Sequence, residues 1–195
     1  LAERLQLTLK ILEFNEAGEL HTDTLAGLIT DKTRLLTVTH ISNALGTINP
    51  VKQLVDIARQ ANVPVLIDGA QAVPHLPIDV QALDCDFYCF SGHKMYGPTG
   101  IGVLYAKQAW LDKLPPYQGG GDMISQVSLE TGSSYQAAPH KFEAGTPNIA
   151  GAIGLAAAID YLEQIGFDKL QQHEHDLLHY ATAQLSAVPD LTLIG

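Results

Sequence analysis

The sequence predicts an α/β fold in which a mainly parallel sheet is flanked by helices. Two runs rich in β-branched and apolar residues, "RLLTVTHISN" (34–43) and "VPVLIDG" (63–69), have the composition of short buried strands. Between them, "NPVKQLVDIARQAN" (49–62) has apolar residues at helical spacing, with Asn49 expected as the cap and Pro50 at the first helical position. A strand, a helix and a strand over about 35 residues predict a parallel pair with a right-handed crossover.

Two further strands are predicted later in the chain, at "DFYCF" (86–90) and "GVLYAK" (102–107). Only about ten residues join them, which is too few for a helical crossover, so the fourth strand should run antiparallel to the third. We expect residues 108–148 to be irregular and the chain to become helical from about residue 149. The small residues in "IAGAIGLAAAIDYLEQIG" favour close helix packing there.

Composition excludes several classes of protein. The 195 residues are 46% hydrophobic and 16% charged, as in ordinary globular proteins, and the net charge of -10 argues against a nucleic-acid or anionic-membrane surface. No apolar run approaches the ~20 residues that cross a bilayer. Cys85 and Cys89 are too far apart along a strand for a disulfide, and we expect both to be reduced and structural in a cytoplasmic protein.

Polar side chains stand where the predicted strands end. Asn43, Asp68 and Lys94 each follow a strand, and ligands of parallel α/β sheets bind beyond these carboxyl ends. Taken singly, each is more often a turn, cap or solvated residue. Together they match what pyridoxal 5'-phosphate requires, which is a lysine for a Schiff base and a carboxylate that keeps the pyridine nitrogen protonated. Ser91 and His93 could hold the phosphate, and Gln71 could reach the ring oxygen. Asn43 could bond either the ring oxygen or the substrate carboxylate.

These motifs resemble a known family. "LIDGAQAVPHLPIDVQALDCDFYCFSGHKMYGPTGIGVLYAK", "THISNALGT" and "FEAGTPN" are similar to SufS-type cysteine desulfurases, within the class V aminotransferases. The resemblance covers nearly the whole chain. It implies the type I pyridoxal phosphate-dependent transferase fold and a homodimer, with residues 1–148 in the large cofactor domain. Residues 149–195 would then form a helical linker and the beginning of a smaller C-terminal domain.

The resemblance also implies a role for each matching residue. Lys94 corresponds to the Schiff-base lysine, Asp68 to the partner of the pyridine nitrogen, and Gln71 to the partner of the ring hydroxyl. Phosphate ligands correspond to Ser91 and His93, and Asn43 corresponds to the asparagine near ring and substrate. Thr146, in "AGTPN", corresponds to a threonine that reaches the phosphate of the other subunit.

The implied reaction converts L-cysteine to L-alanine and passes sulfur to an enzyme persulfide for iron–sulfur cluster assembly, through a sulfur-acceptor protein. The family's nucleophilic cysteine and substrate-binding arginine would lie beyond Gly195, and the start "LAERLQLTLK" suggests a piece of a longer protein. A selenocysteine lyase, another class V aminotransferase-type enzyme, or a non-catalytic fragment remain alternatives.

Three other motifs have simpler interpretations. "GPTGIG" (97–102) precedes a strand, whereas phosphate-binding glycine loops precede a helix. His175 and His179 in "HEHDLLH" are expected on a solvated helix face rather than at a metal site. "GGG" (119–121) is predicted to approach the partner's active site, as the resemblance suggests.

Overall fold

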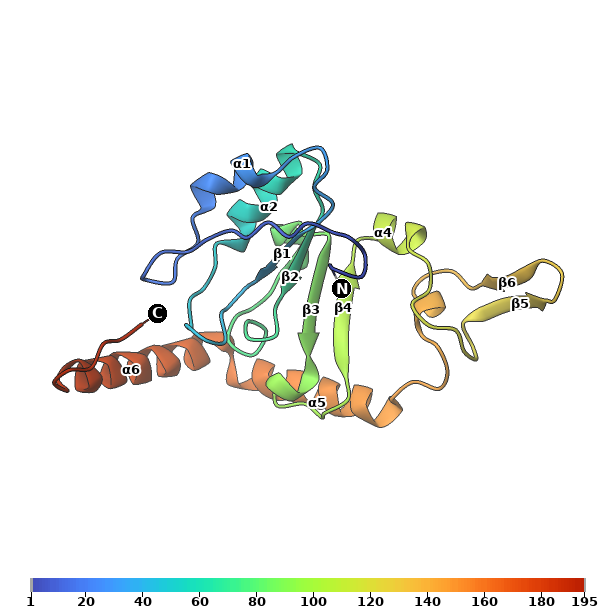
Figure 1. Cartoon of the computed structure of the whole chain (residues 1–195). Coiled ribbons are helices and arrows are strands. Elements are labelled where there is room, and N and C mark those ends of the chain that lie inside the picture. Colours follow the sequence, from blue (N-terminus) through green and yellow to red (C-terminus); the bar gives the residue numbers. More distant parts are fainter. Residues whose placement is uncertain (1, 195) are drawn as a thin grey trace.

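The computed structural model describes residues 2–194 and has a four-stranded sheet in the order β1-β2-β3-β4. Its strands are β1 (Leu36–Thr39), β2 (Val65–Asp68), β3 (Phe87–Ser91) and β4 (Gly102–Ala106). The first three strands are parallel and β4 is antiparallel to β3, so the predicted α/β class and the direction of each strand are confirmed (Figure 1).

The predicted crossover helix is α2 (Val51–Gln60), which connects β1 to β2. Its N-terminus differs from the expectation, because Pro50 occupies the cap position and Asn49 makes no capping bond. Asn49 is 7% exposed, and its amide donates instead to the carbonyl of Thr39 at 2.8 Å. The side chain that was expected to cap the helix therefore pairs a part-buried carbonyl at the end of β1 instead.

Short helices accompany the other connections. A 3₁₀ turn, η1 (Thr22–Thr24), leads into α1 (Leu25–Leu28), which packs beside α2. Between β2 and β3 lies α3 (Val80–Leu83), whose cap residue Asp79 accepts hydrogen bonds from two backbone N–H groups. A second 3₁₀ turn, η2 (Gly92–Lys94), follows β3 directly.

The prediction that residues 108–148 are irregular is wrong in part. This region contains α4 (Gln108–Lys113), the antiparallel hairpin β5 (Ile124–Ser128) and β6 (Gly132–Tyr135), and the 3₁₀ turn η3 (His140–Phe142). The hairpin escaped prediction because β6, "GSSY", is polar and exposed and shows no alternation of apolar residues. The helical C-terminal region is confirmed as α5 (Ile149–Ile165) and α6 (Phe167–Ser186).

The core lies on one face of the sheet. Val65, Ile67 and Tyr88 point to that face and pack against α2, and a second cluster joins Met95 to Leu155 of α5. Alternate strand residues point to the opposite face, which carries Asp68 and Cys89 and an exposed Leu104. Within residues 2–194, this second face is open around Leu104, whereas Trp110 packs against Phe87 farther along β3.

Candidate active site at the strand ends

The three parallel strands bring the predicted site residues to one edge of the sheet. Asp68 is the last residue of β2 and pairs with Thr39 on one side and Cys89 on the other. Ser91 ends β3, and His93 and Lys94 follow it in η2. Asn43 lies in an exposed turn just after β1. The arrangement expected from the strand ends is therefore present in the backbone topology.

Asp68 is held through its backbone and one carboxylate oxygen. Its carbonyl accepts the N–H of His40 at 2.8 Å, and its Oδ1 accepts the N–H of Ala70 at 2.9 Å. The side chain is exposed on the open face of the sheet. Main-chain pairing thus fixes its position while the carboxylate remains accessible to a ligand.

A buried pair lies behind Asp68, on the covered face. The Tyr88 hydroxyl and His40 Nδ1 are 3.0 Å apart, and the two rings meet edge to face. Burial raises the pKa of Tyr88 and lowers the pKa of His40, so both side chains are neutral near pH 7. The two neutral groups share one hydrogen bond, in which one of them donates and the other accepts.

Gly69, directly after Asp68, needs to be glycine. A Cβ there would lie 2.1 Å from Cε1 and 2.2 Å from the hydroxyl of Tyr88. The chain then forms a helix-like turn, in which the carbonyl of Gly69 accepts the N–H groups of Ala72 and Val73 at 2.9 and 3.0 Å. Gln71 lies half-buried in this turn, three residues past Asp68 as predicted.

The loop that carries Lys94 is folded tightly around Gly92. The buried Gly92 donates to the carbonyl of Ile101 at 2.9 Å and accepts from Met95 and Gly97 at 3.0 and 2.9 Å. Met95 is buried beneath it, while the side chains of His93 and Lys94 are exposed. "GPTGIG" therefore closes a turn from η2 into β4, and no helix follows it, as expected.

Thr146 comes from a different part of the chain and is not among the strand-end residues. It is exposed in the loop before α5, next to Asn148, which donates to the carbonyl of Gly100 at 3.2 Å. The "GGG" segment packs against this loop, because the N–H of Gly145 donates to the carbonyl of Gly121 at 3.0 Å. Its predicted approach to a partner's site stays a prediction.

The remaining expectations have the following outcomes. His175 and His179 stack edge to face on the exposed side of α6, and residues 2–194 contain no cluster of three or more metal-ligating side chains. Cys85 and Cys89 are free, but Cys85 lies before β3 in the core whereas Cys89 is half-buried on the open face. Burial raises both thiol pKa values, as befits structural cysteines.

Residues 1–195 match the family model described as aminotransferase class-V, and the chain belongs to this family. It is similar to a cysteine desulfurase of Escherichia coli O127:H6, with 54% identity over 195 residues that make up 100% of this chain and 48% of that protein. A cysteine desulfurase of Escherichia coli strain K12 is 53% identical over the same shares. The chain spans about half the length of the curated relatives it matches.

Solved structures agree with this relationship. The cysteine desulfurase CsdA (S-sulfonic acid) from Escherichia coli superposes with a TM-score of 0.92 at 41% identity, over 96% of this chain and 47% of that one. The apo cysteine desulfurase from Thermococcus onnurineus NA1 gives 0.89 at 41% identity, over 95% and 46%. The predicted type I pyridoxal phosphate-dependent fold is thereby confirmed.

Among residues 2–194, no single helix has the length and hydropathy of a membrane span; only α5 and α6 taken together do, and they are bent by 76°.

Proposed function

We propose that the protein to which this chain belongs is a pyridoxal 5'-phosphate-dependent cysteine desulfurase. It would convert L-cysteine to L-alanine and transfer the sulfur to an enzyme persulfide, from which a sulfur-acceptor protein collects it for iron–sulfur cluster assembly. The supporting observation is that Asp68, Ser91 and Lys94 meet at one sheet edge in a chain 54% identical, over its full length, to cysteine desulfurases. That identity also favours cysteine over selenocysteine as the substrate.

The donor set at this edge fits pyridoxal phosphate. The exposed amine of Lys94 suits the aldehyde, and the accessible carboxylate of Asp68 suits the pyridine nitrogen. A hydroxyl and an imidazole two positions apart, at residues 91 and 93, suit the phosphate. When bound, the cofactor would accept the electrons left on the substrate's α-carbon. We expect a substrate-binding role for Asn43 and a bond from Gln71 to the ring hydroxyl.

Each residue would act on a defined atom. Lys94 would join the cofactor, and its amine, once released by the substrate, would move the α-proton. Asp68 would keep the pyridine nitrogen protonated. A cysteine thiolate beyond residue 195 would attack the sulfur of the substrate. The bond between that sulfur and the substrate's β-carbon would break, and the β-carbon would take up a proton to give alanine. Thr146 would complete the phosphate site of a second subunit in a homodimer, and we place the enzyme in the cytoplasm.

The test uses the full-length protein. It should bind pyridoxal phosphate with a visible absorbance band that borohydride removes, and Lys94→Ala should abolish that band. Asp68→Ala should keep the band but lower alanine production from L-cysteine about a hundredfold or more, because the electrostatic stabilisation of developing charge is lost. Asp56→Ala is the control, since Asp56 pairs with Lys52 on the exposed side of α2.

Undiminished turnover in Asp68→Ala would overturn the role of this carboxylate. Transfer of the amino group to an oxo acid, without release of sulfur from cysteine, would indicate another class V activity. Faster turnover of selenocysteine than of cysteine would indicate a lyase. If residues 1–195 alone show no band while the full-length protein does, this piece is non-catalytic by itself.

A further inference from the structure

Two residues of α6 hold a single residue of the turn that follows Asp68. The side-chain amide of Gln171 donates to the carbonyl of His75 at 3.0 Å, and Oε1 of Glu174 lies 2.6 Å from Nδ1 of the same histidine. Gln171 and Glu174 are three positions apart and therefore share one face of the helix. We call these three residues the His75 clamp.

His75 stands at the far end of the turn that contains Gln71. Successive backbone bonds connect the two ends, since the N–H of Val73 donates to Gly69 at 3.0 Å and the N–H of Leu76 donates to Ala72 at 2.8 Å. The near end is fixed by the sheet, where the N–H of Gly69 donates to the carbonyl of Cys89 at 2.8 Å. The turn is thus attached to the sheet at one end and to α6 at the other.

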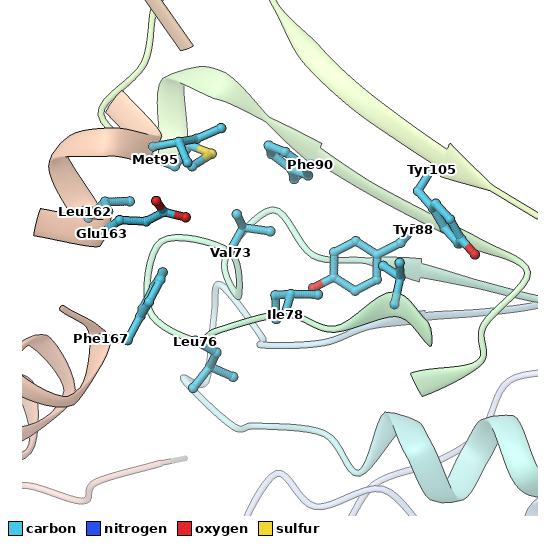
Figure 2. Close-up of a pocket in the computed structure, with 12 residues that line it drawn as sticks. Val73, Leu76, Ile78, Tyr88, Phe90, Met95, Tyr105, Leu162, Glu163 and Phe167 are labelled. Atoms are coloured by element: carbon cyan, nitrogen blue, oxygen red, sulfur yellow. The ribbon is translucent and has the colours of Figure 1, made fainter. Parts of the chain in front are cut away.

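Apolar packing beneath the turn is incomplete. A cavity of about 230 Å³ lies between the turn and the helices. Figure 2 shows Val73 and Leu76 on one side of it and Leu162 and Phe167 on the other. Atoms that line a void lack dispersion partners on that side, so Leu76 at the far end of the turn gains less from apolar packing than the fully buried Ala72. The polar contacts of the His75 clamp are therefore a direct link between the end of the turn and α6.

We propose that Gln171 and Glu174 are positioning residues for the cofactor, acting through His75 on the turn that carries Gln71 and begins at Asp68. This inference rests on the proposed function. The side chains of His75 and Glu174 are 38% and 37% exposed, so solvent screens their attraction and the effect is local rather than global. Loss of the clamp should loosen the turn and weaken cofactor binding about three- to tenfold.

Two measurements on the full-length protein test the clamp. Hydrogen exchange followed by mass spectrometry reports on the backbone N–H groups of the turn, which are those of residues 72, 73, 75 and 76 because residue 74 is proline. Titration of the apoprotein with pyridoxal phosphate gives the dissociation constant. The test variant is Gln171→Ala/Glu174→Ala. Its matched control is Gln172→Ala/Asp176→Ala, because these two residues bond to each other at 2.9 Å on the exposed part of the same helix. The single substitution Glu174→Gln keeps an acceptor oxygen at the same reach, so this variant should retain most of the exchange protection of the unchanged protein.

The test variant should exchange faster in residues 72–76 but not in β2, and its dissociation constant should rise while the control stays unchanged. Equal exchange in test and control would overturn the clamp. Faster exchange with an unchanged dissociation constant would show that the turn does not position the cofactor. If the unchanged protein bound no pyridoxal phosphate, the proposed function would fail, whereas the exchange rates would still decide whether the clamp orders the turn.

Discussion

At the scale of single residues, Gly69 has the tightest surroundings among the described glycines. A Cβ at this position would overlap the Tyr88 ring, whose hydroxyl is bonded to His40, so the ring cannot easily retreat from an added methyl group. We expect Gly69→Ala to lower the free energy of unfolding of the full-length protein by about 3 kcal/mol, the upper end of the cost of overpacking. Urea unfolding measures this. Gly119→Ala, where a Cβ would meet nothing within 4 Å, should change stability little, and equal effects of the two substitutions would contradict the close contact.

His40 gives the molecule a predictable response to acid. Burial lowers its pKa in the folded state below the ordinary value of 6.5, so below that pH the unfolded chain binds more protons than the folded one. The neutral form therefore stabilises the fold above pH 6.5, and this contribution is lost as the pH falls toward the folded-state pKa. Unfolding measured at pH 7.5 and 5.5 should show a larger loss of stability in the unchanged protein than in His40→Gln. A parallel loss in both would refute the assignment.

At the scale of elements, one side chain connects β1 to α2. Asn49 donates through its side chain to Thr39 and through its backbone to the carbonyl of His40, both at 2.8 Å. Removing the amide would leave a part-buried carbonyl at the end of β1 unsatisfied, so Asn49→Ala should lower the free energy of unfolding by about 1–3 kcal/mol. Thermal or urea unfolding of the full-length protein checks this. Gln53→Ala is a suitable control on α2, because the side chain of Gln53 makes an exposed bond to the hydroxyl of Thr22. If Asn49→Ala lowered the free energy of unfolding no more than this control, Asn49 would not connect β1 to α2 as argued.

Local sequence patterns determine most of these elements, so the strands and the direction of β4 could be predicted from the sequence. The strands around Ile67 and Tyr88 are buried apolar runs, and the short link from Ser91 to Gly102 dictates an antiparallel β4. The hairpin at 124–135 lacks such a pattern, so it was missed. Asp68 and Lys94 could be located because parallel strand ends share an edge. His75 gave no signal, because its partners lie 96 and 99 residues away on α6 and only the folded chain brings them together.

At the scale of the whole molecule, the two faces of the sheet differ sharply. One is covered by α2 and α5, while the other presents Asp68 beside an apolar surface in which Leu104 is 62% exposed. Leu178 on α6 is likewise 66% exposed. Exposed apolar surface of this kind marks an interaction face or an aggregation liability. Because the chain spans about half the length of its relatives, we expect the rest of the longer protein to cover the face around Leu104.

A single substitution should therefore have opposite effects in the two contexts. In residues 1–195 alone, Leu104→Lys removes exposed apolar surface. It should therefore reduce both the binding of a hydrophobic dye and self-association, and it should change the free energy of unfolding little. In the full-length protein the same lysine would be buried against the covering segment, and the free energy of unfolding should fall by about 2 kcal/mol or more. The matched control is Leu129→Lys, at the exposed tip of the hairpin. It should change the free energy of unfolding equally little in residues 1–195 and in the full-length protein. If Leu104→Lys were harmless in the full-length protein, the face would be open there as well, and the cofactor edge would be more exposed to water than the proposed chemistry requires.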